Sequence, residues 1–486
     1  MNRQIVKLFA FIVVLFGVLV GFTSYWSVFD AEALKEKDAN KRPLLEAQQI
    51  PRGRIFTADG ELIAKSVPKG KGNSKRYVRR YPQGALFGHP IGYSFVREGD
   101  SEFEQFHNEE LVGEEGEFVS IADELLGHQQ EGNDIVTNID ADAQRTALAA
   151  LQEAGFGAVV AIEPDTGAVK AMVSNAPFDP NRVPYDLTQM NRNAIETPLL
   201  NRATQGLYPP GSTFKVVTAA AGLDSGLITP DTPIDAPGSL VVEGTPLEND
   251  FGQDFFGATL DTALTNSVNT WFGQLGQQLG NDTLFEYMER FGFNATPAID
   301  LPDDEVYNSG VYGEDGDLLR ASDPVDLARL AIGQERLLAT PLQMTEVAAA
   351  VANGGKLMKP QIWKKVIDPE GRVVEEMDPS TYSEPISEQT AEELTTAMEG
   401  VVREGTGTNA AISGITVAGK TGTAETPGNK ACGGGIEENQ AWFIGFAPAD
   451  DPQIAIAASV ECTEQFGGDV AAPIFRAVAE SILNGE

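Results

Sequence analysis

Three short motifs in a fixed order carry the residue types that acyl transfer through a serine ester requires. The first places Ser212 three residues before Lys215, after a Pro-Pro-Gly turn. The second pairs Ser267 with Asn269, and the third is the Lys-Thr-Gly-Thr run at 420–423, which follows a β-branched stretch. Together they supply a nucleophile, a base, a proton relay, an amide clamp and an anchor for an anion.

The first motif predicts a nucleophile and its base on one face of a helix. The turn stiffened by proline feeds a helix whose positive dipole end lies beside Ser212, and Lys215 projects from the same face one turn later. A serine hydroxyl is inert until a base takes its proton. Lys215 can do so only if burial and a nearby positive charge lower its pKa. The apolar run after Lys215 predicts the burial, and Lys420 is the expected charge.

The other two motifs complete the predicted site. Ser267 can pass a proton between Lys215 and the departing amine, and the amide of Asn269 matches a peptide bond in a substrate. Lys420 and Thr421 can hold a substrate carboxylate, and Gly422 lets a ligand approach the backbone. The backbone N–H groups of Ser212 and Thr423 form the expected oxyanion hole.

Two similar strings in the sequence do not carry the same chemistry. Ser66 and Lys69 repeat the Ser-x-x-Lys spacing, but Pro68 interrupts any helix between them and the segment lies in a basic polar loop. Residues 414–421 satisfy the phosphate-loop pattern Gly-x-x-x-x-Gly-Lys-Thr. That loop needs a helix after the lysine, whereas here Pro427 follows a β-branched run.

The elements that must position these motifs begin with strands. The stretch from Ile50 to Phe56, an Asp-Gly turn at 59–60 and a return from Leu62 predict a hairpin. A helix is expected over 141–153 after a capping Asp140. The remaining predictions are a strand hairpin over 157–173, helices dominating from 213 to about 398, strands at 415–421, 441–446 and 454–460, and a last helix over about 472–483. This order implies one mixed sheet with helices on both faces.

The N-terminus predicts a membrane anchor. No charged residue occurs from Leu8 to Phe29, and a helix of about 22 residues rises roughly 33 Å. Arg3 and Lys7 precede this run, so the start of the chain should stay cytoplasmic and the rest should lie outside. A cleaved signal peptide is the alternative, but the apolar run exceeds the ~7–15 residues of its core.

Composition excludes some functions and leaves two features open. The net charge of −36 in 486 residues argues against nucleic-acid binding. A basic cluster at 69–80 is either a solvated loop or a surface for anionic lipid, glycan or a partner. Cys432 and Cys462 are the only cysteines, and either form a disulfide or remain thiols. The three histidines are widely spaced, so no metal site is predicted.

The motif set resembles that of the class B penicillin-binding proteins, the peptidoglycan D,D-transpeptidases. Val268 replaces the aspartate of the Ser-Asp-Asn pattern, which favours the transpeptidase branch over class A β-lactamases. The resemblance extends over nearly the whole chain beyond the apolar run, at 52–55, 59–60, 80–82, 92–93, 102–113, 137–140, 161–167, 208–215, 340–343, 352–354 and 442–448.

The resemblance implies an α+β fold, with an antiparallel sheet of about five strands between helices, behind a strand-rich pedestal and one transmembrane helix. It implies an anchor at 1–30, a pedestal, or dimerisation-like, domain at 31–150 and a penicillin-binding transpeptidase domain at 151–486, with no room for a glycosyltransferase domain. Ser212 would attack the bond between two terminal D-alanines of a stem peptide, an amine of a neighbouring stem would resolve the ester, and β-lactams would acylate Ser212. No cofactor or metal is implied.

The expected partners are peptidoglycan stem peptides, lipid-linked precursor strands, β-lactams, the cytoplasmic membrane and a membrane glycan polymerase. Two other functions remain open. One is hydrolysis, by a D,D-carboxypeptidase or an anchored β-lactamase, which differs only in whether water reaches the acyl-enzyme. The other is a β-lactam sensor or division scaffold that binds without turnover.

Overall fold

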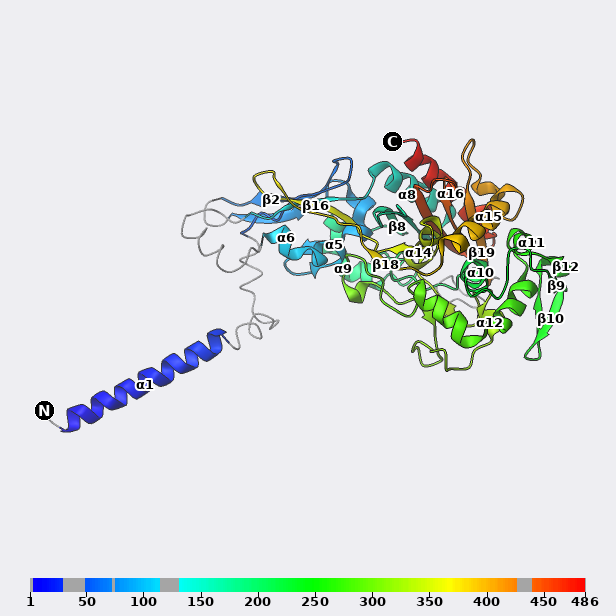
Figure 1. Cartoon of the computed structure of the whole chain (residues 1–486). Coiled ribbons are helices and arrows are strands. Elements are labelled where there is room, and N and C mark those ends of the chain that lie inside the picture. The colour runs from blue at the N-terminus through cyan, green and yellow to red at the C-terminus, as the bar shows by residue number, and fades with distance from the viewer. Residues whose placement is uncertain (1–2, 29–48, 72–74, 114–130, 426–438, 486) are drawn as a thin grey trace.

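The computed structural model describes residues 3–28, 49–71, 75–113, 131–425 and 439–485. The first element is helix α1 (Arg3–Val28), as the apolar run predicts. Its span from Arg3 to Tyr25 has a mean hydropathy of 2.8, none of it is buried, and it is long and apolar enough to cross a membrane. In Figure 1 it lies apart from the rest of the molecule, whose two largest sheets have six and five strands.

The first sheet has six strands and takes them from two distant parts of the chain. Their order across the sheet is β17-β16-β6-β1-β2-β3. β6 runs parallel to β1 and antiparallel to β16, so this sheet is mixed. The strands are β1 (Ile55–Phe56), β2 (Leu62–Lys69), β3 (Arg76–Arg80), β6 (Asp134–Thr137), β16 (Trp363–Ile367) and β17 (Val373–Glu376). The predicted domain boundary at residue 150 stays a prediction, and the first sheet has strands on both sides of it.

The hairpin predicted at the start of this sheet is confirmed, with Gly60 in the left-handed region at φ +91° in the turn before β2. The prediction of a loop at 69–80 is wrong for the described residues, because β2 continues to Lys69 and β3 occupies Arg76–Arg80. Pro68 is tolerated in β2 because only the first residues of that strand also pair with β1.

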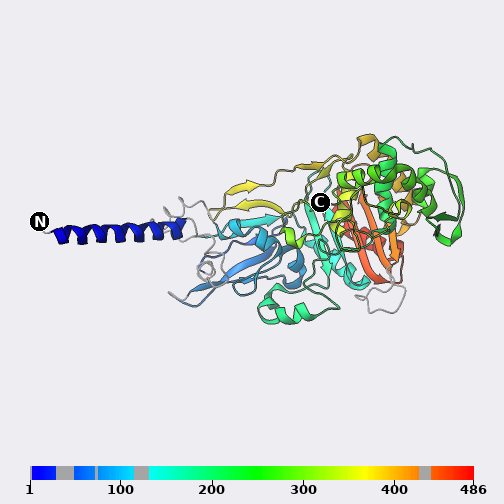
Figure 2. The same ribbon diagram turned by 90° about the horizontal axis from the view of Figure 1, so that it is seen from below.

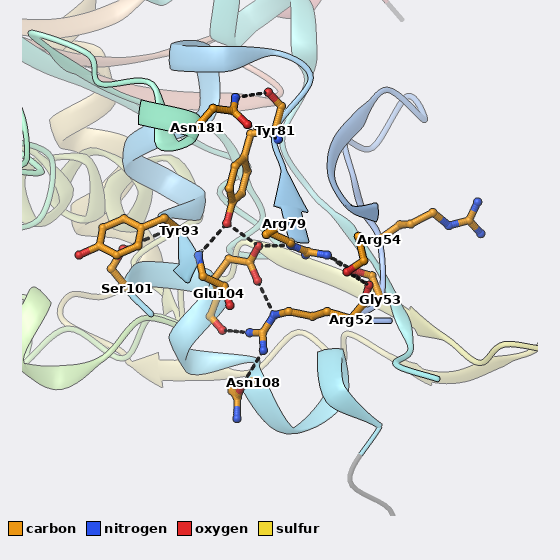
Figure 3. Close-up of polar contacts among 12 residues, drawn as sticks. Arg52, Gly53, Arg54, Arg79, Tyr81, Tyr93, Ser101, Glu104, Asn108 and Asn181 are labelled. Atoms are coloured by element: carbon orange, nitrogen blue, oxygen red, sulfur yellow. Dashed lines mark hydrogen bonds and ion pairs between the residues drawn. The ribbon is translucent and has the colours of Figure 1, made fainter. Parts of the chain in front are cut away.

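A buried ionic cluster ties the pedestal together (Figure 3). Glu104 on α5 (Glu102–Phe106) accepts from Nε of Arg79 at 2.6 Å, from Nε of Arg52 at 2.7 Å and from the hydroxyl of Tyr81 at 3.0 Å. Burial alone would raise the pKa of Glu104, but the two guanidinium groups outweigh it and hold that pKa below its usual value. The cluster therefore fixes β3 against the segment that precedes β1.

The second sheet has five strands, in the order β19-β20-β21-β7-β8, and every pair is antiparallel. The mixed sheet expected from the order of elements is therefore wrong for this domain, and the antiparallel sheet implied by the family resemblance is confirmed. The strands are β7 (Gly157–Ile162), β8 (Val169–Asn175), β19 (Ala418–Glu425), β20 (Asn439–Ala447) and β21 (Ile454–Thr463).

Helices cover both faces of this sheet (Figures 1 and 2). On one face lie α8 (Ala141–Ala154), capped by Asp140 as predicted, and α16 (Gly467–Leu483). α14 (Pro341–Ala352) packs on the other face. Side chains of β20 alternate between these layers, so that Phe443 packs against Phe475 of α16 while Trp442 points into the opposite core.

The middle of the chain is less helical than expected. It has α10 (Lys215–Asp224), α11 (Leu260–Thr265), α12 (Asn269–Arg290), α13 (Leu327–Leu330) and α15 (Glu388–Arg403). Between these helices lie four two-stranded ladders, β9 (Ile234–Ala236) with β12 (Phe255–Ala258), β10 (Ser239–Val242) with β11 (Thr245–Glu248), β13 (Gly310–Val311) with β14 (Leu337–Leu338), and β15 (Leu357–Met358) with β18 (Thr381–Ser383). The remaining α-helices and strands are α4 (Gly88–Ile91), β4 (Ser94–Phe95), β5 (Gly99–Asp100), α6 (Asn108–Val112) and α9 (Val183–Arg192).

Candidate active site

The predicted nucleophile lies in a short 3-10 helix rather than in the first turn of an α-helix. This helix, η4 (Gly211–Phe214), runs directly into α10, which begins at Lys215. Gly211 adopts φ +53° and donates its N–H to the carbonyl of Gly333 at 3.0 Å. Ser212 is half-buried, while the residues on either side of it are buried. The turn therefore presents the Ser212 side chain to solvent on a rigid base.

Lys215 has the buried environment that a lysine base requires. It has no exposed surface, and its Nζ donates to the carbonyl of Ser267 at 2.7 Å and to Oδ1 of Asn269 at 2.6 Å. A neutral amine has two N–H groups and one lone pair, so these two acceptors leave the lone pair to accept a hydroxyl proton, and the hydroxyl oxygen of Ser267 lies 3.1 Å from Nζ. In the part of the chain that the structure describes, the hydroxyl of Ser212 makes no hydrogen bond, a common geometry before a substrate binds.

Ser267 lies between the two lysines. It occupies the connection between α11 and α12 in the left-handed region, at φ +55°, which costs free energy for a residue with a side chain. Its Oγ lies 3.1 Å from Nζ of Lys215 and 3.1 Å from Nζ of Lys420. This backbone conformation turns both the carbonyl and the hydroxyl of Ser267 toward Lys215.

Asn269 is the first residue of α12, and its amide already has protein partners. Oδ1 accepts from Lys215, and Nδ2 donates to the carbonyl of Glu248 at 2.8 Å. The side chain thus connects the base to the end of β11. One N–H of the amide is still available to a ligand.

The Lys-Thr-Gly-Thr run lies in β19, an edge strand of the second sheet, beginning three residues later than predicted. Lys420 is fully buried and also donates to the carbonyl of Thr421 at 2.9 Å. The hydroxyl of Thr423 accepts from the N–H of Gly467 at 3.1 Å, which ties this end of β19 to the start of α16. The position of Lys420 within a strand also argues against a phosphate loop.

Gly422 is required for a protein contact. A Cβ at this position would lie 2.7 Å from the carbonyl oxygen of Pro210 and 2.9 Å from Cγ2 of Thr213. The sequence predicted a gap for a ligand, whereas the structure shows that η4 itself packs against β19 here. This close approach brings the nucleophile turn and the predicted anion-binding strand together.

The electrostatics of the pair agree with the prediction. Burial, reinforced by the positive charge of Lys420, lowers the pKa of Lys215 well below its usual value. Burial also lowers the pKa of Lys420, to about 7. Asp250, an exposed residue in the connection between β11 and β12, raises both values. Near neutral pH the structure therefore favours an uncharged Lys215 beside a Lys420 that can be charged.

Sequence reasoning missed the residues that act on the site from outside the motifs. Gly333 holds Gly211, the indole N–H of Trp442 donates to the carbonyl of Pro209 at 3.0 Å, and Asp250 acts through its charge. Trp442 belongs to a segment that carried the family resemblance, so that signal was present. Asp250 and Gly333 lie outside every motif, and no feature of the sequence indicated that they act on the site. The predicted pairing of Cys432 with Cys462 falls outside the described residues, because Cys432 is not among them.

Two family models match the chain. The penicillin binding protein transpeptidase domain matches residues 157–480, and the penicillin binding protein A dimerisation domain matches residues 52–135. Both matches agree with the resemblance seen in the motifs. In length and layout the sequence also looks most like actinobacterial penicillin-binding protein A.

The relatives and solved structures agree with these models. The chain is 32% identical over 508 residues to the peptidoglycan D,D-transpeptidase PbpA of Mycolicibacterium smegmatis, with 99% of each chain covered. It is 33% identical to penicillin-binding protein A of M. tuberculosis in a ceftriaxone acyl-enzyme complex, with a TM-score of 0.79 over 90% of this chain and 100% of that one. The D,D-transpeptidase domain of a peptidoglycan glycosyltransferase from Eggerthella lenta is 32% identical, with a TM-score of 0.77 over 90% and 99%.

Proposed function

This chain belongs to the penicillin-binding protein transpeptidases, and from that membership we propose that Ser212 is the residue that carries the acyl group. The protein is a serine-type peptidoglycan D,D-transpeptidase of cell-wall synthesis and a target of β-lactams. The roles of individual residues below are our proposal. It is supported above all by Ser267, whose hydroxyl oxygen lies 3.1 Å from the side-chain nitrogen of each of the two buried lysines.

Acylation begins when Oγ of Ser212 attacks the carbonyl carbon between the two terminal D-alanines of a donor stem peptide. The neutral amine of Lys215 takes the proton of the hydroxyl as the C–O bond forms. The C–N bond then breaks, and the departing D-alanine receives a proton from Lys215 through the hydroxyl of Ser267. An amine of a neighbouring stem then attacks the ester carbon, and the C–O bond to Ser212 breaks as the new C–N bond forms the crosslink. Lys215 takes a proton from this amine and passes it to Oγ of Ser212, which restores the hydroxyl.

Binding groups surround this centre. Lys420 and Thr421 hold the terminal carboxylate of the donor peptide, and a carboxylate beside Lys420 favours the charged form of that lysine. Asn269 offers its remaining N–H to the donor backbone. Gly422 keeps β19 close to η4, so that the N–H groups of Ser212 and Thr423 converge on the oxyanion.

Covalent labelling tests the assignment of the nucleophile. Fluorescent penicillin should label the full chain, and Ser212→Ala should abolish the label. Ser66→Ala is the matched control because Ser66 heads the other Ser-x-x-Lys string, here in strand β2, and it should label like the unchanged protein. Persistent labelling of Ser212→Ala would contradict the proposal.

Crosslinking and hydrolysis are separated by their products. With purified peptidoglycan strands, a transpeptidase yields crosslinked peptides, whereas a carboxypeptidase yields free shortened ends of lower mass. A non-catalytic scaffold would still support growth of a depletion strain as Ser212→Ala, whereas a catalyst would not. We expect crosslinked product and failed complementation.

The proposal extends to the location and partners of the protein. We place α1 in the cytoplasmic membrane as a single-pass anchor, residues 31–150 as a dimerisation-like pedestal and residues 151–486 outside as the catalytic domain. The enzyme then meets lipid-linked precursor strands and a membrane glycan polymerase. Alkaline carbonate should leave the chain in the membrane fraction, and release by carbonate would contradict α1 as an anchor.

A further inference from the structure

The hairpin formed by β2 and β3 concentrates positive charge in a strongly acidic protein. Between Leu62 and Arg80 the sequence contains seven basic residues and no Asp or Glu, although the whole chain carries a net charge of −36. The basic residues are Lys65, Lys69, Lys71, Lys75, Arg76, Arg79 and Arg80. Such a segregation of charge on one element indicates a surface for an anionic ligand.

The strand register places like charges directly opposite each other. Lys65 pairs with Arg80, and Lys69 pairs with Arg76. Val67 and Val78 form the pair between them, so all six side chains lie on one face of the hairpin. Directly opposed like charges destabilise a hairpin. This face therefore has an unfavourable interaction that an external anion would relieve.

Among the residues that the structure describes, none supplies a counter-charge to this face. The described ion pairs near the hairpin join Arg79 and Arg52 to Glu104, and Arg54 to Asp134. Within the described residues none of Lys65, Lys69, Arg76 and Arg80 forms an ion pair, and the last three are exposed.

The opposite face is firmly attached to the pedestal (Figure 3). Arg79 binds Glu104 and donates to the carbonyl of Gly53 at 2.5 Å, and the hydroxyl of Ser66 donates to the carbonyl of Arg52 at 3.0 Å. Arg52 belongs to the segment through which the chain reaches the pedestal from α1. In Figures 1 and 2 the hairpin extends away from the five-stranded sheet, toward the end of the molecule where α1 lies.

We propose that the face of the hairpin formed by Lys65, Lys69, Arg76 and Arg80 docks on anionic phospholipid headgroups of the membrane that α1 enters. This inference rests on the proposed anchorage by α1. The attraction acts only within about 10 Å at ordinary ionic strength, so it requires an element tethered near the bilayer. The acidic remainder of the chain is repelled by the same surface, so docking would orient the pedestal with the active site away from the membrane.

Lysine acetylation by a reagent that does not cross membranes tests the docking. The full chain is reconstituted in vesicles of phosphatidylcholine, with or without phosphatidylglycerol, and mass spectrometry gives the rates at Lys69 and Lys75. Phosphatidylglycerol should slow both rates about fivefold, as one typical interaction between a basic side chain and an anionic surface would. High salt should restore them. Lys364 on β16, exposed in the same sheet, is the internal reference and should not change.

A charge-reversal variant should keep the hairpin folded while it removes the net positive charge of this face. In Lys69→Glu with Arg80→Glu, each like-charged pair becomes an attractive pair, and the protection of Lys75 should disappear. Lys356→Glu with Lys359→Glu makes the same change of charge elsewhere and should keep the protection.

Unchanged acetylation in phosphatidylglycerol vesicles, with the chain resistant to carbonate, would overturn the docking surface alone. Release of the chain by carbonate would count against both the anchor and the docking. Protection by soluble polyglutamate, without protection by phosphatidylglycerol, would assign the face to an acidic polymer and overturn the lipid proposal. Penicillin labelling of the same samples reports on the active site separately.

Discussion

The side-chain nitrogens of Lys215 and Lys420 both lie 3.1 Å from one hydroxyl oxygen, that of Ser267. Both lysines are fully buried, so two ammonium groups at this spacing would repel each other with little screening. The arrangement favours one charged and one neutral amine, with a hydroxyl between them that can pass a proton.

Ser267→Ala should slow acylation by fluorescent penicillin about a hundredfold to ten-thousandfold, because it removes this relay and leaves the two lysines without the hydroxyl. The protein should remain folded, with Lys215 still bound to Asn269. Time courses of labelling give the rate. Ser225→Ala, at the end of α10, should label at the normal rate, and a normal rate for Ser267→Ala would remove the relay from the mechanism.

Asp250→Asn should move the whole pH profile of acylation to lower pH. Asp250 raises the pKa of both lysines, so the loss of its charge lowers both. The acidic limb, which requires neutral Lys215, and the alkaline limb, which requires charged Lys420, should therefore shift in the same direction. Labelling rates between pH 5 and 9 measure the shift. Glu243→Gln, in the exposed turn between β10 and β11, should leave the profile in place; opposite shifts of the two limbs would contradict the assignment.

Gly422→Ala should impair acylation by about a hundredfold, because the added Cβ would push β19 away from Pro210 and Thr213. Labelling rate and melting temperature should both fall. Gly17→Ala in α1 adds a methyl group with no atom within 4 Å and serves as the control. Full activity of Gly422→Ala would show that the close contact between η4 and β19 is not needed.

Glu104→Gln should destabilise the pedestal by about 3–5 kcal/mol, because it leaves the guanidinium groups of Arg52 and Arg79 buried without their counter-charge. The exposed pair of Arg54 and Asp134 gives the contrast, and Asp134→Asn should cost at most about 1 kcal/mol. Denaturant unfolding monitored by circular dichroism compares the two variants. If the two variants lost similar amounts of unfolding free energy, the burial of Glu104 would not explain its effect.

Glu346→Gln should stabilise the protein increasingly as the pH rises. Burial raises the pKa of Glu346 to about 8, against about 4.3 in an unfolded chain. Below the pKa of Glu346 in the unfolded chain, the carboxyl is protonated in both states and burial carries no charge penalty. As the pH rises from there through the pKa in the folded protein, the folded protein progressively loses stability relative to the unfolded chain. The gap in melting temperature between variant and parent should therefore widen from pH 5 to pH 8. Glu392→Gln, exposed on α15, should show no such widening.

The site was predictable because its chemistry is local in sequence. Ser212 and Lys215 are one turn apart, and Lys420 to Thr423 lie within one strand, so each motif predicts its own geometry. The burial of Lys215 followed from the apolar residues after it. Asp250 lies in a loop without any motif, and its charge acts through space on Lys215 and Lys420. The sequence does not indicate how close the Asp250 carboxylate lies to either lysine.

The fold was predictable where a pattern is long and regular. β7, β8, β20 and β21 were predicted at or close to their observed positions, because they are buried and rich in β-branched or aromatic residues. The helical middle was overestimated because its ladders have only two to four residues per strand. The strand from Leu62 was predicted, but residues 69–80, which include β3, were interpreted as a loop because glycines and lysines hid the pairing of β3 with β2.

The strand order of the first sheet has a consequence for biosynthesis. β6 lies between β1 and β16, so until residues up to 367 have been made, a growing chain presents β6 as an open edge. The second sheet waits longer still, since β7 pairs with β21. Neither sheet is complete before strands from the later part of the chain have been made, and a chain stopped at residue 150 would lack β16 and leave β6 as an open edge that could pair with another chain.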